Sequence, residues 1–210
     1  MILFADNDIL MKLAGCDLLI PFCDAIQLEN QDCYLTSTAR RAIPSQAKKG
    51  KNKLTNPDLY QKLVEFVNRT KAITDAVPQH EILDELSSAS NIDPGEAQLI
   101  LSAYNNPSSK IATGDRRCLV SLLNTSSLKE ITDNLSQRVY TLEIAMLILI
   151  EKLGYETVNE KVIQRCVDDT VLRMAFGESR SVDNAIACLS SYSSEVIPLL
   201  SDSHLIKINN

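Results

Sequence analysis

The chain alternates short, continuous runs of apolar residues with longer segments of helical periodicity. Four such runs lie at residues 2–5, 33–36, 71–75 and 110–113, and turn or helix-start residues follow them. Apolar runs without alternation are typical of strands that are buried on both faces of a parallel sheet. Strands separated by helices predict βαβ units, so we expect a mixed α/β fold with a parallel central sheet.

The second part of the chain is mostly helical in pattern. Residues 138–142 are either a last strand or the first turn of a helix that runs to Gly154. A long helix is expected to end at Gly177, a residue type common just after helix ends. A further helix covers residues 181–192, and residues 196–208 are left open between a strand and an irregular tail.

These two parts are expected to pack together as a domain and an extension. No segment rich in glycine, proline or serine, the usual composition of a linker, separates them. We therefore predict a domain at residues 1–132 and a helical extension at residues 133–210 that packs on it. Because the extension's helices carry wide apolar stripes, the alternative is that they form a homo-oligomer or bind a regulatory partner protein.

Composition indicates a soluble cytoplasmic protein and excludes several kinds of site. The longest apolar run, at residues 144–150, is too short to span a bilayer, and acids interrupt the N-terminal segment, so we expect no membrane association. The six cysteines form no Cys-x-x-Cys pair and are expected to be reduced. With only His80 and His204, a histidine-based zinc site or a serine-type triad is not expected.

Three acids occupy positions that favour a shared site. Asp6 follows the first apolar run, Asp115 follows the run at residues 110–113, and Glu96 opens the helix between them. Because parallel strands end at one edge of a sheet, Asp6 and Asp115 should meet there, and Glu96 can join them if the topology is favourable. Carboxylates held together repel each other unless a divalent cation neutralises them. Oxygen ligands without histidine or cysteine suit Mg²⁺ or Mn²⁺, which can promote phosphodiester hydrolysis.

A purely structural role is the alternative for each of these acids. Aspartate is a preferred N-cap residue, so Asp6, Asp8 or Asp115 can simply begin a helix. Asp93 and Glu96 have the spacing of a capping box, and Pro94 at the first helical position is a further helix-start signal. Only the joint placement of the acids after strands favours a site over a set of caps.

Three segments resemble the PIN-domain nuclease family: FADNDILMKLA, DPGEAQLILSA and IATGDRRCL. The shared pattern is an apolar strand that ends in Asp, a later helix that begins with Gly-Glu-Ala, and a strand that ends in Thr-Gly-Asp. The resemblance covers about residues 1–123. It implies a Rossmann-like, three-layer α/β/α fold and a Mg²⁺- or Mn²⁺-dependent endoribonuclease, of a kind that includes toxins and defence effectors.

The resemblance also implies roles for individual residues. Asp6, Glu96 and Asp115 would be the catalytic acids that bind the metal ion. Asp8 and Asp93 would be neighbours able to join the metal site, and Thr113 would support it through its hydroxyl group.

One position departs from the family pattern. The family places a glutamate on the helix after the second strand, where this chain has TSTARR at residues 36–41 and no acid between Asp32 and Asp58. Glu143 could supply a carboxylate at the same edge, and its alternative is a solvated acid near a helix N-terminus. The departure also supports a different class of protein, a catalytically degenerate PIN-like module that binds RNA or a partner protein.

Basic residues concentrate in a segment that follows the second predicted strand. The net charge of −6 predicts no general affinity for nucleic acid, so RNA binding requires a local basic patch. We predict that six cations contact RNA phosphates, with a solvated loop as the alternative for the first four. They are Arg40, Arg41, Lys48, Lys49, Arg116 and Arg117.

A second enzyme class also matches some of these residues. Asp6-x-Asp8 resembles the nucleophile and acid pair of haloacid-dehalogenase-like phosphatases, Thr36 their phosphate-binding hydroxyl, and Gly114-Asp115 part of their metal motif. Against this reading, Leu119 occupies the position of a second metal-motif acid, and Glu96 has no role in such a site.

Overall fold

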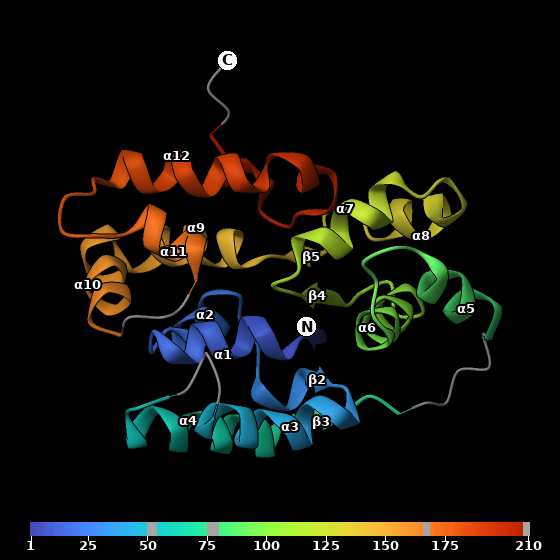
Figure 1. Ribbon diagram of the computed structural model, residues 1–210, viewed down its shortest axis with the longest axis horizontal. Helices are drawn as coiled ribbons and strands as arrows, with labels where there is room; N and C mark the ends of the chain where they lie inside the picture. The colour runs from blue at the N-terminus through green and yellow to red at the C-terminus, as the bar shows by residue number, and fades with distance from the viewer. Residues whose placement is uncertain (50–53, 75–79, 166–168, 208–210) are drawn as a thin grey trace.

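The computed structural model describes all residues except 50–53, 75–79, 166–168 and 208–210. The described residues contain a sheet of five parallel strands in the order β3-β2-β1-β4-β5 (Figure 1). The strands are β1 (Leu3–Ala5), β2 (Cys33–Leu35), β3 (Lys71–Ala72), β4 (Lys110–Ala112) and β5 (Val139–Tyr140). The predicted mixed α/β fold with a parallel sheet is therefore confirmed.

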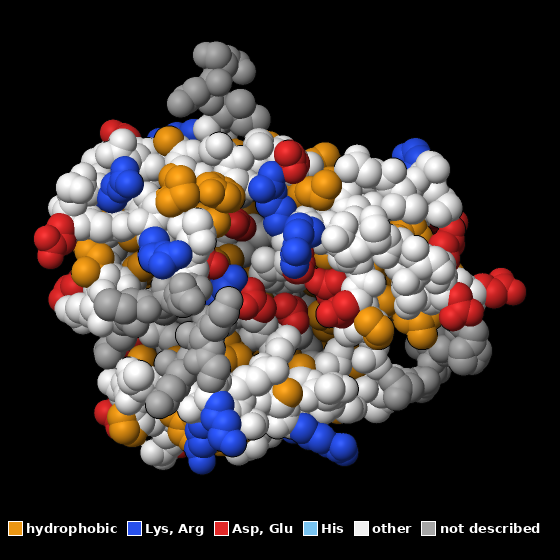
Figure 2. Space-filling view, viewed as in Figure 1, with side chains coloured by type: hydrophobic (Ala, Val, Ile, Leu, Met, Phe, Trp, Pro, Cys, Tyr) orange, Lys and Arg blue, Asp and Glu red, His pale blue; other side chains and the backbone are white. Residues whose placement is uncertain are grey.

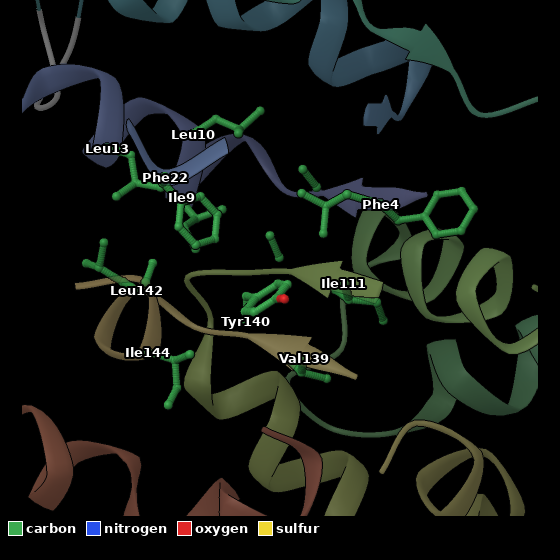
Figure 3. Close-up of a cluster of buried hydrophobic side chains, with 14 of the residues drawn as sticks. Phe4, Ile9, Leu10, Leu13, Phe22, Ile111, Val139, Tyr140, Leu142 and Ile144 are labelled. Atoms are coloured by element: carbon green, nitrogen blue, oxygen red, sulfur yellow. The ribbon is translucent and has the colours of Figure 1, made fainter. Parts of the chain in front are cut away.

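Burial explains why these short apolar runs form strands. All three residues of the central strand β1 are buried, and β1 pairs with β2 on one side and β4 on the other. Figure 3 shows side chains from α1 (Asn7–Gly15), α2 (Leu19–Ala25) and α9 (Leu142–Leu153) gathered around the strands. Among them, Phe22 packs edge-on against Tyr140, with ring centroids 5.6 Å apart.

Helices flank the strands on both sides. The strand order reverses between β1 and β4, and right-handed crossovers then place the earlier and later helices on opposite sides. Figure 1 shows α1 and α2 to the left of the strands, with α5, α6 and α8 to the right, and α6 contacts both β1 and β4. The remaining elements up to β5 are η1 (Asn30–Asp32), α3 (Ser37–Lys48), α4 (Pro57–Arg69), α5 (His80–Ser88), α6 (Pro94–Tyr104), α7 (Arg116–Asn124), η2 (Ser126–Leu128) and α8 (Lys129–Asn134).

Beyond β5 the chain is helical, and α9 is its central element. Nine consecutive residues of α9, from Leu142 to Ile150, are buried, and α9 contacts α2, α10 and α12. In Figure 1, α12 lies along the top of the molecule above α9. The elements after α9 are α10 (Tyr155–Arg165), α11 (Thr170–Ala175), α12 (Val182–Ser193), η3 (Ser194–Leu199) and η4 (Ser203–Leu205).

The structure corrects one sequence-based expectation for this part and decides others that were left open. The single long helix expected up to Gly177 is wrong, because α10 and α11 are separate helices. The tail forms 3₁₀ turns rather than a strand, although Leu200 makes one parallel bridge with Val139 and covers the outer edge of β5. The sheet also continues past residue 132, since β5 pairs with β4. In the described residues, no helix is long and apolar enough to cross a membrane.

Candidate functional site

The candidate site lies at the carboxyl ends of β1 and β4, where the strand order reverses. The backbone N–H of Asp6 donates to the carbonyl oxygen of Ala112 at 2.8 Å, so the residues that follow the two strands start side by side. Connections lead away from such a point in opposite directions and leave a crevice. A cavity of about 570 Å³ opens here, and Figure 2 shows acidic side chains gathered in a hollow at the centre of this face.

All of the acids predicted for the metal site line this one cavity, which we call the acid cavity. Sequence positions far apart therefore meet at one place, as the parallel-strand argument requires. The predicted acids are Asp6, Asp8, Asp93, Glu96, Asp115 and Glu143.

The two acids that follow strands also cap helices. Asp6 accepts hydrogen bonds from the backbone of Asn7 at 2.7 Å and Asp8 at 3.3 Å, and so begins α1. Asp115 accepts from the backbone of Arg117 at 2.8 Å and Cys118 at 3.2 Å, and so begins α7. Asp6 and Asp115 both cap helices and both line the acid cavity, so their role as helix caps does not exclude a role in a chemical site.

The third acid, Glu96, belongs to a complete capping box. Its backbone N–H donates to Asp93 Oδ1 at 2.8 Å, and its own carboxylate accepts from the backbone N–H of Asp93 at 2.8 Å. The N-termini of α1, α6 and α7 therefore all face the acid cavity. Each contributes positive partial charge from free N–H groups, which attenuates the repulsion among the carboxylates.

Glu143 lies in the first turn of α9, which begins directly after β5. The residue is only 9% exposed and lines the acid cavity. Glu143 makes no hydrogen bond or ion pair that the described residues supply. Its carboxylate therefore joins those of the other predicted acids in that cavity.

The turn after β4 is fixed by Thr113 and brings Gly114 against the carboxylate of Asp8. The buried hydroxyl of Thr113 accepts a hydrogen bond from the backbone N–H of Asp115 at 3.1 Å, which fixes the turn. A Cβ atom built on Gly114 would collide with the carboxylate of Asp8, so only glycine allows this close approach. Thr113 thus supports the site through the backbone of Asp115.

Crowding of carboxylates changes their protonation. Burial and the charge of Asp8 raise the pKa of Asp6 from 3.8 to about 6. Burial, followed by the charges of Asp93, Asp115 and Asp6, raises the pKa of Glu96 from 4.5 to about 7. The charges of Asp115 and Asp6 both act on Glu96, as expected for carboxylates that line one cavity.

Lys12 and Asp169 line the same cavity but were not predicted. Lys12 Nζ lies 2.7 Å from Asp8 Oδ2 and 2.8 Å from Asp169 Oδ2, so it links α1 to the N-cap of α11. Burial by itself would lower the pKa of Lys12, but the hydrogen bonds that its ammonium donates to Asp169 and Asp8 outweigh burial and raise that pKa. The spacing of Asp8 and Lys12 by four residues is a helix-pair signal, whereas nothing in the sequence places Asp169 beside them.

The predicted phosphate-binding residues separate into two groups. Arg116 and Arg117 line the acid cavity, and Arg116 Nη2 bonds to Glu195 Oε2 at 2.6 Å. The buried Nε atom of Arg116 has no hydrogen-bond partner in the described part of the chain.

The four cations on α3 and just after it lie away from the cavity. Ile43 and Ala47 are buried, which fixes the rotation of α3 about its axis. In this rotation the cations do not lie on the side of the helix that faces the acid cavity. Arg40, Arg41, Lys48 and Lys49 are not among the residues that line the acid cavity.

The acid cavity gathers carboxylate oxygens, the type of donor that hard divalent cations bind. A cation bound there would offset the repulsion that, after burial, contributes to the raised pKa values of Asp6 and Glu96. Over the described ranges, no three acid, histidine or cysteine side chains are arranged to hold an ion as they stand. Ligation therefore requires rotation of carboxylates away from their present hydrogen bonds.

Comparisons with protein-family models, with curated proteins and with solved structures each find no match to this chain.

Proposed function

We propose that this chain is a divalent-metal-dependent endoribonuclease with a Rossmann-like, three-layer PIN-type fold. The observation that carries the proposal is the joint placement of Asp6, Glu96 and Asp115 in one cavity at the switch point of a parallel sheet. The strand order and the helices on both sides of the strands support the Rossmann-like assignment. The three segments that resemble PIN-domain nucleases contribute these same three acids.

In this proposal, Asp6, Glu96 and Asp115 hold Mg²⁺ or Mn²⁺, with Asp8, Asp93 and Glu143 close enough to complete the set. When bound, the ion lowers the pKa of a water molecule and stabilises charge on the phosphodiester. The chain's own residues bring the acids together in one cavity and present three helix N-termini to an anionic substrate.

Cationic contacts for the substrate come from the mouth of the acid cavity. The guanidinium of Arg116 lines this cavity, and the exposed side chain of Arg117 can contact the phosphate backbone of the RNA. Because the protein carries a net charge of −6, this local pair is needed to attract RNA. Arg40, Arg41 and the lysines after them would contact only RNA that extends beyond the cavity.

The direct test is cleavage of a circular single-stranded RNA by the purified protein with Mn²⁺ or Mg²⁺. A circular substrate has no ends, so its conversion to linear RNA shows endonucleolytic cutting. We expect Asp6→Asn and Asp115→Asn each to reduce the cleavage rate by about 10²-fold or more, because each removes a metal-binding charge. Circular DNA measured in parallel decides whether the sugar matters.

Asp58→Asn is the matched control, since Asp58 is exposed in the first turn of α4 and lines no part of the acid cavity. The control should cut at the rate of the unchanged protein. Equal cutting by all three variants would refute the site assignment. Hydrolysis of a phosphomonoester, blocked by Asp6→Asn and without RNA cleavage, would instead favour the phosphatase class.

A non-catalytic, RNA-binding or partner-binding module is the second candidate function. The observation in its favour is that no three of the described side chains are arranged to hold an ion, while Lys12 supplies a cation of the protein's own within the cavity. Calorimetry with Mn²⁺ separates the two functions. Heat from Mn²⁺ binding that disappears in Asp6→Asn supports the nuclease, and a folded protein that binds no Mn²⁺ supports the module.

A further inference from the structure

A second cavity adjoins the acid cavity and differs from it in chemistry. It has a volume of about 400 Å³ and shares Asp6, Asn7, Asp93 and Glu96 with the acid cavity. Apart from these shared acids, its described lining residues carry no charge, so we call it the neutral cavity. Its own lining includes Thr38, Ala42, Gln46, Pro94, Gln98 and Leu99.

One wall of the neutral cavity is a face of α3. Thr38, Ala42 and Gln46 follow one another at intervals of four residues, so they lie on one side of the helix. This is the helix on which the PIN pattern would place an acid, and here that side carries a hydroxyl, a methyl and an amide group. The acids of this cavity therefore all lie on the wall that it shares with the acid cavity, and its α3 side suits an uncharged group.

Amide groups supply the polar contacts of the neutral cavity. Asn7 Nδ2 donates to Gln46 Oε1 at 3.1 Å, which joins α1 to α3. Each amide carries both donor and acceptor atoms, so this bond leaves hydrogen-bonding capacity on both residues. Together with the apolar surfaces of Ala42 and Leu99, this gives apolar walls with a few polar groups, the usual composition of a small-molecule site.

We propose that the neutral cavity binds a nucleobase of the RNA substrate while the neighbouring phosphate lies in the acid cavity. A nucleobase is uncharged and planar, with apolar faces and an edge of donors and acceptors that amides can match. The shared wall of Asp6 and Glu96 places such a base directly beside the carboxylates. This inference rests on the proposed nuclease function and adds that cleavage depends on the identity of one base.

The test compares binding of five probes by calorimetry in the presence of Mn²⁺: the four nucleoside 5′-monophosphates and ribose 5-phosphate, which lacks a base. At least one nucleotide should bind about tenfold more tightly than ribose 5-phosphate. Gln46→Ala, which removes an amide, and Ala42→Leu, which fills the cavity, should each abolish that difference while affinity for ribose 5-phosphate stays unchanged. Gln61→Ala, an exposed amide on α4, should retain it.

Every outcome decides the inference. Equal affinity for all five probes, absence of binding, or a base preference that survives Gln46→Ala would overturn it. Gln46 is exposed, so its replacement keeps the test valid even if Ala42→Leu does not fold. Mn²⁺-dependent RNA cleavage without any base preference would reject the neutral cavity alone, whereas base binding without cleavage would reject the nuclease function and keep the cavity.

Discussion

Asp6 begins α1 through two backbone hydrogen bonds, yet its pKa is raised to about 6 by burial and by the charge of Asp8. The same carboxylate therefore stabilises the helix locally and is destabilised by its surroundings. Such a conflict is common at functional sites, where residues are not chosen for stability alone. A substitution that removes the charge of Asp6 but keeps its helix cap separates these two effects on stability.

Asp6→Asn should stabilise the metal-free protein. Asparagine still caps α1, and the substitution removes repulsion toward Glu96. We expect the free energy of unfolding to rise by about 1 kcal/mol at about pH 8, or the melting temperature by about 2–4 °C. Differential scanning calorimetry measures this shift, and Asp58→Asn serves as the unshifted control. A lower melting temperature for Asp6→Asn would show that its charge stabilises the fold.

The raised pKa values of Asp6 and Glu96 also predict an unusual pH dependence. Both groups bind protons more tightly in the folded state, so their ionised forms destabilise the fold. This destabilisation is complete above the folded-state pKa values of about 6 and 7, and it disappears as the pH falls toward the unfolded-state values of 3.8 and 4.5. The metal-free protein should therefore become more stable as the pH falls from about 8 to 5. Thermal melts across this range test the sign.

Two comparisons isolate the origin of this pH dependence. Glu96→Gln should flatten it, because the group with the higher raised pKa is removed. Burial would raise the pKa of Asp17, but the hydrogen bonds donated by Lys161 and Lys62 lower it. Asp17 therefore contributes to the pH dependence with the opposite sign, but only near and below its ordinary pKa of 3.8. Stability that rises from about pH 5 to 8 in the metal-free protein would contradict the prediction.

At the scale of elements, the short helix α11 connects the C-terminal part of the chain to the acid cavity. Asp169 caps α11 by accepting from the backbone of Leu172 at 2.9 Å, and its other oxygen binds Lys12 at 2.8 Å. The side chains of both charged residues are largely buried, at 15% exposure for Lys12 and 10% for Asp169. The pair is therefore shielded from solvent more than a surface ion pair.

Asp169→Ala should lower the free energy of unfolding by about 2 kcal/mol, since it removes a cap and a partly buried ionic partner together. Asp169→Asn, which can still cap, should cost about half as much. Ser181→Ala is the control for a cap without an ion pair, because Ser181 caps α12 and is exposed. Urea denaturation measures all three. No loss in Asp169→Ala would mean that the link does not stabilise the fold.

At the scale of the whole molecule, the boundary expected at residue 132 crosses a continuous core. Strand β5 pairs with β4, Tyr140 packs against Phe22 of α2, and α9 buries nearly all of its first three turns against α2 and α12. Removal of this segment would expose a large apolar surface on the remaining helices and leave β4 as an unprotected sheet edge.

A chain truncated after Asn134 should not unfold cooperatively. The full chain buries the edge of β4 under β5 and the surface of α2 under α9, so the truncated chain loses both. Circular dichroism during heating should show a broad, non-cooperative change and a tendency to aggregate. A sharp transition close to that of the full chain would show that residues 1–134 fold as an independent domain.

The sequence by itself determined the features that depend on neighbours along the chain. Apolar runs marked four of the five strands, whereas the fifth, β5, was left open between a strand and the first turn of a helix. The parallel arrangement that those runs predicted placed Asp6 and Asp115 at one edge, and the Asp-Pro-Gly-Glu segment identified the start of α6 and its capping box. These inferences needed only strand direction and local helix chemistry.

Only the tertiary structure decided which distant residues share the cavity. Lys12 and Asp169 are far apart in sequence, and their contact depends on how α11 is placed over α1. Burial of Glu143 and the turning of Arg40 and Arg41 away from the acids follow from the packing of α9 and α3, because a helix rotates to bury its apolar side. The local sequence pattern determines which side of each helix or strand can be buried. The packing of all elements together determines which distant side chains come into contact.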